Sequence, residues 1–275
     1  MANYNVLTLS EPVTDFVATT SPETINVQCS LTEDAQRKRV WAVCKAGGIP
    51  AHPYDGVRVE MDVLMGLPLS EISEGDFISL NENSAPVLFY VAKHGYEPEL
   101  NGPGRSLVVR KDCYDNRQWH TSDVNAYATC ALNTWLNGTY KALLDVDIQE
   151  RIATTKFYYT PGNGNKTVST LERSIFTLSL TELGKAMNYA NIEGIALPIA
   201  TVLQTAYLNG SINVQWTRSP NTNGTGLVWE LYNSGSVINY ANAHLSYGSR
   251  PAFTLPSDML FSFEPNPDGS FNPIL

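Results

Sequence analysis

The chain has 275 residues, of which 43% are hydrophobic and 16% charged, and its 27 acidic and 18 basic residues give a net charge of −9. This length and composition predict a globular protein with one large domain, or with a large domain and a small one. The acidic balance argues against nucleic acid and an anionic membrane surface as partners, because both require clustered Lys and Arg.

The sequence contains no apolar run near the roughly 18 residues of a membrane-spanning helix, so we expect no membrane insertion. Its N-terminal stretch, MANYNVLTLSEPVTDF, lacks the basic and apolar regions of a secretory signal peptide. A protein acting outside the cell would then leave by another route, such as lysis. The four cysteines (Cys29, Cys44, Cys113 and Cys130) lack metal-binding spacing, and we expect free thiols, with a Cys113–Cys130 disulfide as the alternative.

Residues 1–75 are predicted to form a small β unit followed by a linker. Alternating runs rich in β-branched residues predict strands at 39–45 and 57–63, with shorter ones at 6–9 and 25–29. The unit is too small to bury a deep core alone. The linker is expected at 64–74.

From residue 76 the pattern changes to a mixture of strands and short helices. Strands are predicted at 77–80, 87–92, 107–111, 156–159 and 174–179, with a long Gly/Asn loop between the last two. A helix is predicted from an N-cap at Ser122-Asp123 to a stop at Asn137-Gly138. Two more short helices are predicted at 140–150 and at 181–190, the last capped by Thr181, while 201–209 fits either type.

Two motifs near the C-terminus, WTRSP at 216–220 and SRPAF at 249–253, flank a run rich in Asn, Ser, Tyr and Gly. The flanking motifs are typical of buried strand ends with fixed turns. The run between them has the composition of a surface that recognises a ligand, because Tyr offers a large rigid face and Asn and Ser offer adaptable hydrogen bonds. The alternative is a solvated loop of turn-forming residues.

We therefore predict a ligand-binding site within this run and no catalytic or metal-binding residues. Trp216 could also anchor a ligand, as a Trp beside a polar loop often does. The predicted ligand-binding residues are Trp229, Glu230, Tyr232, Asn233, Ser234, Asn239, Tyr240, Asn242, His244, Ser246 and Tyr247.

Other residues that suggest chemistry have simpler structural interpretations. Arg218 and Arg250 could clamp a carboxylate or phosphate, but a buried structural role is favoured, and Trp119 and Trp135 are expected in the core. His120 lies near three Asp residues but lacks a second metal ligand or a nucleophile at a suitable spacing, so capping and turn formation are favoured.

Two loop motifs are also expected to be inert. TPGNGN at 160–165 lacks the GK[ST] ending of a phosphate-binding loop. The triplet EPN at 264–266 occurs in sugar-binding C-type lectins that use calcium, but here it follows the closing strand without the rest of such a calcium site.

The ordered motifs LVVRKDCYDNRQWHTSDVNAYA, TKFYYTPGNG, SIFTLSLTELG, WTRSP and YGSRPAF resemble a domain family of unknown function found in Gram-positive gut bacteria and their phages. The family is related to the C-type-lectin and formylglycine-generating-enzyme fold, and its W-x-R-S-P and G-x-R-P-A hallmarks are met at 216–220 and 248–252. The resemblance covers residues 76–256 and implies an α+β fold, with short helices on a small twisted antiparallel sheet and long loops. Its last strands and loops would form the ligand face.

The resemblance also implies a domain organisation and a function. Residues 1–75 would be an attachment or oligomerisation unit, 76–256 the ligand-binding domain, and 257–275 a tail. The chain would be a non-enzymatic receptor-binding protein of a phage tail or fibre, located in the virion and extracellular after host lysis. Its partners would be a bacterial surface receptor (protein or glycan) and other tail proteins, and it would form a homo-oligomer, for which a trimer is one candidate state and the sequence leaves the number of subunits open.

Three further points follow from the resemblance. No cofactor is expected, and the oxidative chemistry of the formylglycine-generating relatives is not carried over, because all four cysteines lie at or before Cys130. The alternative function is a bacterial cell-surface adhesion module of the same fold. The run at 229–247 also resembles the variable positions of diversity-generating retroelement proteins, and the sequence leaves open whether it is diversified or merely polar.

Overall fold

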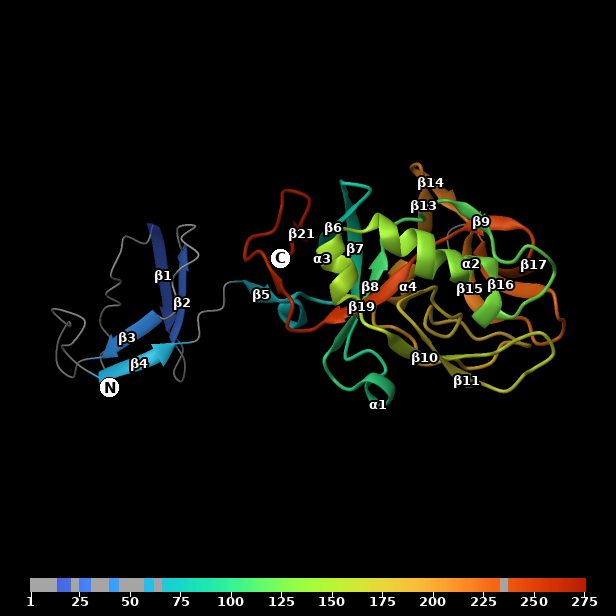
Figure 1. Cartoon of the computed structure of the whole chain (residues 1–275), viewed down its shortest axis with the longest axis horizontal. Coiled ribbons are helices and arrows are strands. Elements are labelled where there is room, and N and C mark those ends of the chain that lie inside the picture. Colours follow the sequence, from blue (N-terminus) through green and yellow to red (C-terminus); the bar gives the residue numbers. More distant parts are fainter. Residues whose placement is uncertain (1–13, 21–24, 31–39, 45–56, 62–65, 233–236) are drawn as a thin grey trace. The chain divides into compact units, whose positions relative to one another are not determined.

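The computed structural model describes residues 14–20, 25–30, 40–44, 57–61, 66–232 and 237–275. The chain divides into two compact units, Met1–Met65 and Gly66–Leu275, here called unit 1 and unit 2 (Figure 1). In unit 1, β1 (Thr14–Thr20) pairs with β2 (Ile25–Ser30), and β3 (Val40–Cys44) pairs with β4 (Val57–Met61), both antiparallel. The strands expected at 25–29, 39–45 and 57–63 are thus confirmed, while 6–9 lies outside the described residues.

The larger sheet of unit 2 has six strands in the order β12-β19-β8-β7-β6-β21, all antiparallel to their neighbours except β21, which runs parallel to β6. Its middle strand β8 has four consecutive buried residues, as expected for a strand covered on both faces. The strands expected at 77–80, 87–92 and 107–111 are confirmed. The six strands are β6 (Phe77–Glu82), β7 (Ala85–His94), β8 (Arg105–Arg110), β12 (Ile175–Phe176), β19 (Ala252–Pro256) and β21 (Ser270–Phe271).

A two-residue turn sets the register between β6 and β7. Asn83 and Ser84 connect the paired residues Glu82 and Ala85, and both have positive φ, 53° and 63°. A two-residue turn with both central residues left-handed matches the twist of the flanking strands, and Asn tolerates this conformation better than most residues.

A second sheet, of five strands, lies at the end of unit 2 away from β5 and β21 (Figure 1). Three two-stranded pairs complete the β structure: β10 (Thr155–Tyr159) with β11 (Ser169–Arg173), β13 (Ala206–Leu208) with β14 (Ser211–Asn213), and β5 (Leu67–Pro68) with β20 (Leu260–Phe261). The long loop expected after 159 therefore contains a strand, because β11 returns along β10.

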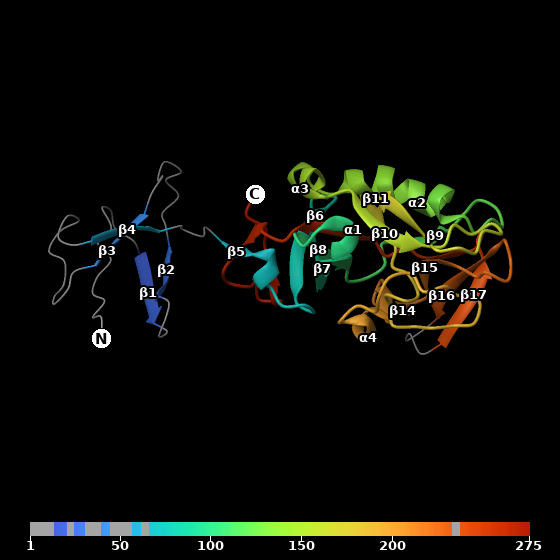
Figure 2. The same ribbon diagram turned by 90° about the horizontal axis from the view of Figure 1, so that it is seen from below.

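The helices are short: α1 (Pro98–Asn101), α2 (Ala131–Trp135), α3 (Val146–Arg151) and α4 (Ala200–Leu203), with single turns at Leu69–Glu71, Tyr127–Thr129, Leu136–Tyr140 and Lys141–Leu143. Figure 2 shows α2 and α3 on one side of unit 2 and α4 on the opposite side. No helix among the described residues is both long and apolar enough to cross a membrane. The fold is mixed α+β, mostly strands in open sheets with few short helices.

The helix expected from Ser122 to Leu136 is wrong at both ends. It begins only at Ala131, where the Cys130 thiol accepts a hydrogen bond from the Asn133 amide. Helical turns then continue past the expected stop, because the Asn137 side chain accepts from the amides of Ser174 and Ile175 and so fixes this turn against β12.

The helix expected at 181–190 is also wrong, and its segment forms turns. The side chains of Thr181 and Glu182 contact more distant residues, although Glu182 also accepts a hydrogen bond from the nearby Ser179 amide. Thr181 donates to the Asn191 carbonyl, and Glu182 binds Arg218. The helix expected at 140–150 is interrupted at Leu144, where the backbone is extended before α3 begins.

The segments expected to be a linker and a tail both contribute to the core of unit 2. Leu69 and Ile72 are buried, and the Leu69 amide donates to the Met259 carbonyl. Phe261, beyond the expected end of the domain, is fully buried.

Arg218, in β15 (Gln215–Pro220), is the centre of a buried polar cluster. Its guanidinium forms two hydrogen bonds with the Glu182 carboxylate, at 2.6 and 2.9 Å, and both side chains are fully buried. Tyr96 donates to the same carboxylate at 2.5 Å, and the ring of Phe157 lies 4.6 Å from the guanidinium carbon. Burial alone would lower the pKa of Arg218, but Glu182 raises it well above its ordinary value. The favoured structural role of Arg218 is confirmed.

We predict that Arg218→Met lowers the free energy of unfolding by about 3–5 kcal/mol, because it leaves the Glu182 carboxylate buried without a counter-charge. Urea denaturation measures the loss. The double variant Arg218→Met/Glu182→Gln should recover part of it, since the unpaired charge is then removed. A loss below about 1 kcal/mol for the single variant would contradict this account of the cluster.

Candidate binding face

The five-stranded sheet carries the residues predicted to bind a ligand. Its order is β17-β16-β15-β18-β9, which brings β9, from the first half of the chain, beside the C-terminal strands. Its strands besides β15 are β9 (Asn116–Gln118), β16 (Leu227–Tyr232), β17 (Val237–Asn242) and β18 (Ser246–Gly248).

The pairing of the strands divides the predicted residues between two faces of the sheet. Directly paired residues on neighbouring strands share a face, and so do residues two apart on one strand. Glu230 is paired with Trp216 on one side and with Asn239 on the other, and Tyr232 lies two residues further along β16. We call this side the Glu230 face.

Two more residues extend the Glu230 face across the sheet. The ring of Tyr247 lies 4.9 Å from that of Trp216, edge to face, and Tyr247 is paired with Arg117 on β9. Tyr232 is 42% exposed and Asn239 is exposed, whereas Trp216 is buried. The face therefore has a buried aromatic floor with exposed Tyr and Asn side chains beside it.

Glu230 is the exceptional residue of this face. It is only 1% exposed, and its Oε2 has no hydrogen-bond partner among the residues that the structure describes. Three other buried glutamates of unit 2 are paired: Glu82 with Arg110 and Tyr140, Glu182 with Arg218 and Tyr96, and Glu193 with Ser219 and the Thr160 amide. A buried carboxylate without a partner is costly, so Glu230 is not explained by the stability of the fold.

The pKa values of Glu230 and Tyr247, two residues of this face, are both raised. Burial raises the pKa of Glu230 to about 7. Burial is also the largest cause that raises the pKa of the Tyr247 hydroxyl. The negative charge of Glu230 raises it further, and Tyr232 adds a smaller effect in the same direction. The polar ends of these three side chains are therefore close enough to interact electrostatically.

Trp229 and Tyr240 lie on the opposite face of the same strands. Their rings are 5.3 Å apart, edge to face, and the Trp229 indole donates to the Tyr189 carbonyl at 3.3 Å. Trp229 is 3% exposed and belongs to the core, so the structure gives it a packing role, while Tyr240 is 47% exposed. The predicted residues thus do not form one continuous site.

The remaining predicted residues lie around the rim of the sheet. Asn242, His244 and Ser246 are exposed, and His244 Nδ1 lies 2.6 Å from the Asp123 carboxylate, so Asp123 holds this turn instead of capping a helix. Asn233 and Ser234 lie outside the described residues.

Arg250 and Gly248 fix the strands beneath this face. The buried Arg250 guanidinium donates to the carbonyls of Arg110, Lys111 and Leu203, which confirms its structural role. A Cβ on Gly248 would lie 2.4 Å from the Cys113 sulfur and 2.6 Å from the Val214 carbonyl oxygen. Only glycine fits there, which explains the glycine of the G-x-R-P-A motif.

A shallow pocket that the sequence did not reveal lies at the β9 edge. Its volume is about 360 Å³, and Arg117 stacks on Trp135 at 3.6 Å from the ring centroid while pairing with Asp115. Trp135 was expected in the core, but it is only half-buried; Trp119 is fully buried, as expected. The pocket is lined by Asp115, Asn116, Arg117, Gln118, Ala131, Trp135 and Ser246.

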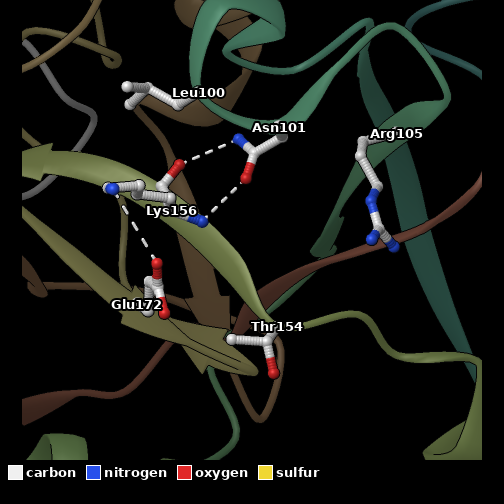
Figure 3. A pocket seen from close by; sticks show the side chains of 6 residues that line it. All are labelled: Leu100, Asn101, Arg105, Thr154, Lys156 and Glu172. Carbon is white, nitrogen blue, oxygen red and sulfur yellow. Dashed lines mark hydrogen bonds and ion pairs between the residues drawn. The ribbon is translucent and has the colours of Figure 1, made fainter.

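A second shallow pocket, of about 340 Å³, lies between α1 and β10 (Figure 3). The Asn101 side chain forms two hydrogen bonds with the Lys156 backbone, and the Lys156 ammonium lies 3.9 Å from Glu172. These contacts hold α1 against β10 and engage the polar groups of Asn101 and Lys156 without a ligand.

The other residues that could carry out chemistry have structural roles where the structure describes them. His120 accepts a hydrogen bond from the Ser122 amide within a turn, and Cys113 and Cys130 are buried free thiols, not a disulfide. The described residues contain no group of three or more His, Cys, Asp or Glu side chains that could hold a metal ion.

We predict that Trp229→Ala lowers the free energy of unfolding by about 3–5 kcal/mol, because it leaves a cavity in the core. The control, His244→Ala, should cost about 1 kcal/mol or less, since it removes only an exposed ion pair. Thermal or urea denaturation measures both. Equal, small losses would show that Trp229 does not have the packing role described here.

We also predict that Glu230→Gln stabilises the protein in a pH-dependent way. The folded pKa of about 7 lies above the ordinary value of about 4.3, so the protonated form stabilises the folded state fully below pH 4.3, and this contribution is lost as pH rises to 7. The advantage of the variant in unfolding free energy should therefore grow between pH 4.5 and 7 and then level off, at about 1–3 kcal/mol. The exposed control Glu172→Gln should show no such trend in urea denaturation, and a trendless Glu230→Gln would refute the prediction.

Comparison with known proteins identifies a family for this chain, but that family has no known function. No curated protein and no solved structure matches the chain. The model of a family described as "Domain of unknown function (DUF6273)" matches residues 103–257, a segment that runs from the start of β8 through β19 and includes the whole five-stranded sheet. Because this match covers more than half of the chain, the protein is a member of the DUF6273 family.

Proposed function

We propose that the chain is a non-enzymatic receptor-binding protein of a phage tail or fibre, and that it binds a bacterial surface receptor through the five-stranded sheet. The observation that carries the proposal is the Glu230 face, where exposed Tyr232 and Asn239 and half-buried Tyr247 lie on one side of a sheet with a buried floor. Aromatic and amide side chains held on a rigid support bind with little loss of conformational entropy.

The proposal includes a C-type-lectin-like fold for unit 2. Its support is the combination of short helices, antiparallel sheets and long irregular segments, with the last strands of the chain carrying the exposed Tyr and Asn residues. Unit 1 would attach the protein to other tail proteins and form a homo-oligomer, with a trimer as one candidate state, in the virion.

Diversification of the run at 229–247 is a further part of the proposal. Tyr232, Asn239, Tyr240, Asn242 and His244 are exposed, and exposed positions tolerate substitution with small changes in stability. The strands on which they lie are held by buried residues of the flanking motifs, so variation at the surface would leave the support intact.

We predict that the triple variant Tyr232→Ala/Asn239→Ala/Tyr247→Ala loses at least about tenfold in affinity for its host cells, because it removes the aromatic and amide contacts of the face. The fluorescently labelled full-length chain is incubated with a panel of Gram-positive gut bacteria, and bound protein is measured by flow cytometry.

The matched control is Tyr207→Ala, on the β13–β14 hairpin, whose side chain is 42% exposed, as is that of Tyr232. This variant should bind cells as the wild type does. Unchanged binding by a correctly folded triple variant, on cells that the wild type binds, would contradict the proposed site.

A further inference from the structure

Glu230 carries an inference about what the Glu230 face recognises. Its carboxyl group is buried, one oxygen has no partner among the described residues, and no cation is paired with it. Leaving a carboxylate in this condition costs free energy that a neutral residue in the same strand would avoid. A ligand that supplies the missing partner would recover that free energy on binding.

We propose that Glu230 is the charged subsite of the binding face and that it takes a primary ammonium group of the ligand. The inference rests on the proposed function, since it concerns the same face. An ammonium offers three N–H donors and a positive charge, which together match an ionised carboxylate oxygen that lacks a hydrogen bond.

The surroundings of Glu230 favour a cation of this kind. On β15 the Trp216 ring is its direct cross-strand neighbour, and on β18 the Tyr247 ring contacts Trp216, so two aromatic rings lie beside the carboxyl group. Aromatic faces attract ammonium groups, and more strongly in a desolvated site. A metal ion would need several oxygen ligands, and no acidic cluster that could hold one occurs in the described residues.

The titratable and charged groups around Glu230 leave the carboxylate uncompensated. Tyr232 on β16 and Tyr247 on β18 carry hydroxyls, Asn239 on β17 and Trp216 on β15 are neutral, and no cation lowers the pKa of Glu230. Arg117 shares the face but lies on β9, two strands beyond β15, where it pairs with Asp115 and stacks on Trp135. The ammonium would enter between Tyr232 and Tyr247, displacing the exposed Tyr232 side chain.

Isothermal titration of the full-length chain with Nα-acetyl-lysine methylamide and with glucosamine tests the proposal, and the two probes separate a protein from an amino-sugar source. At pH 8 at least one amine should bind, and its Nζ- or N-acetylated form should bind about tenfold to hundredfold more weakly, because the charged hydrogen bond is lost. Glu230→Gln should weaken amine binding to the same extent, while Glu172→Gln should not change it.

The pH dependence of amine affinity distinguishes a binding role of Glu230 from a purely structural role, which would not produce it. Below pH 7 the amine must displace a proton from Glu230, so affinity should fall by up to about tenfold per pH unit. With Nα-acetyl-lysine methylamide, whose ammonium stays charged throughout, titrations at pH 6 in buffers of different ionisation enthalpy should show release of about one proton, and at pH 8.5 almost none. Glu230→Gln should release none at either pH.

Absence of binding by both amines at pH 8, equal binding by the acetylated forms, or equal binding by Glu230→Gln would overturn the inference. Its failure is distinct from failure of the proposed function. If no amine binds but the triple variant still loses cell binding, the face binds a ligand of another chemistry. If the triple variant keeps full cell binding, the proposed function fails first.

Discussion

The paired charges of Arg218 and Glu182 are the constraint on which the arrangement of unit 2 depends. Arg218 lies in β15 of the five-stranded sheet, Glu182 in the turns that follow β12, and Tyr96 near the end of β7, so the ion pair and the Tyr96 hydrogen bond together join three distant segments. Such a pair is expensive to desolvate, and it is tolerated because each hydrogen-bonding group of both partners is used. The ion pair fixes the register of β15, because the guanidinium reaches the Glu182 carboxylate in one register and not in others.

Fixing β15 also fixes the two strands beside it, β16 and β18, which carry five of the eleven predicted binding residues. Arg250 and Gly248 hold the opposite side of the same strands through carbonyl contacts and a close backbone approach. The molecule thus concentrates its buried charge and its tightest packing directly beneath a surface of tyrosine and asparagine. Within that surface, Glu230 Oε2 and Arg117 Nε are buried polar atoms without a partner among the described residues, and groups of this kind weaken a fold.

The sequence predicted more of the framework than of the site. Alternating β-branched runs identified β6, β7 and β8, and an Arg beside a Pro in a strand motif was enough to favour structural roles for Arg218 and Arg250. The prediction of a helix at 181–190 was wrong because polar residues of this segment make long-range contacts, and helix propensity contains no information about such contacts. The run that the sequence singled out does carry exposed Tyr and Asn side chains, yet Trp229 could not be separated from Tyr232, because which face a residue occupies depends on cross-strand register. Glu230 was among the predicted ligand-binding residues, but nothing in the sequence set it apart from the others, since its lack of a partner exists only in three dimensions.

The parallel pairing of β21 with β6 has a consequence for how the protein can be divided. The segment matched by the family, 103–257, contains β8 and β19 but leaves out β6, β7 and β21. Expressed alone with those boundaries, it would turn β8 from a central strand into an exposed edge and remove Phe89 of β7, whose ring contacts Phe253 of β19 at 5.4 Å. Unpaired edges of this kind recruit other chains and aggregate. The segment that is recognisable in sequence is therefore shorter than the compact unit, residues 66–275, that contains the neighbouring strands of its sheet.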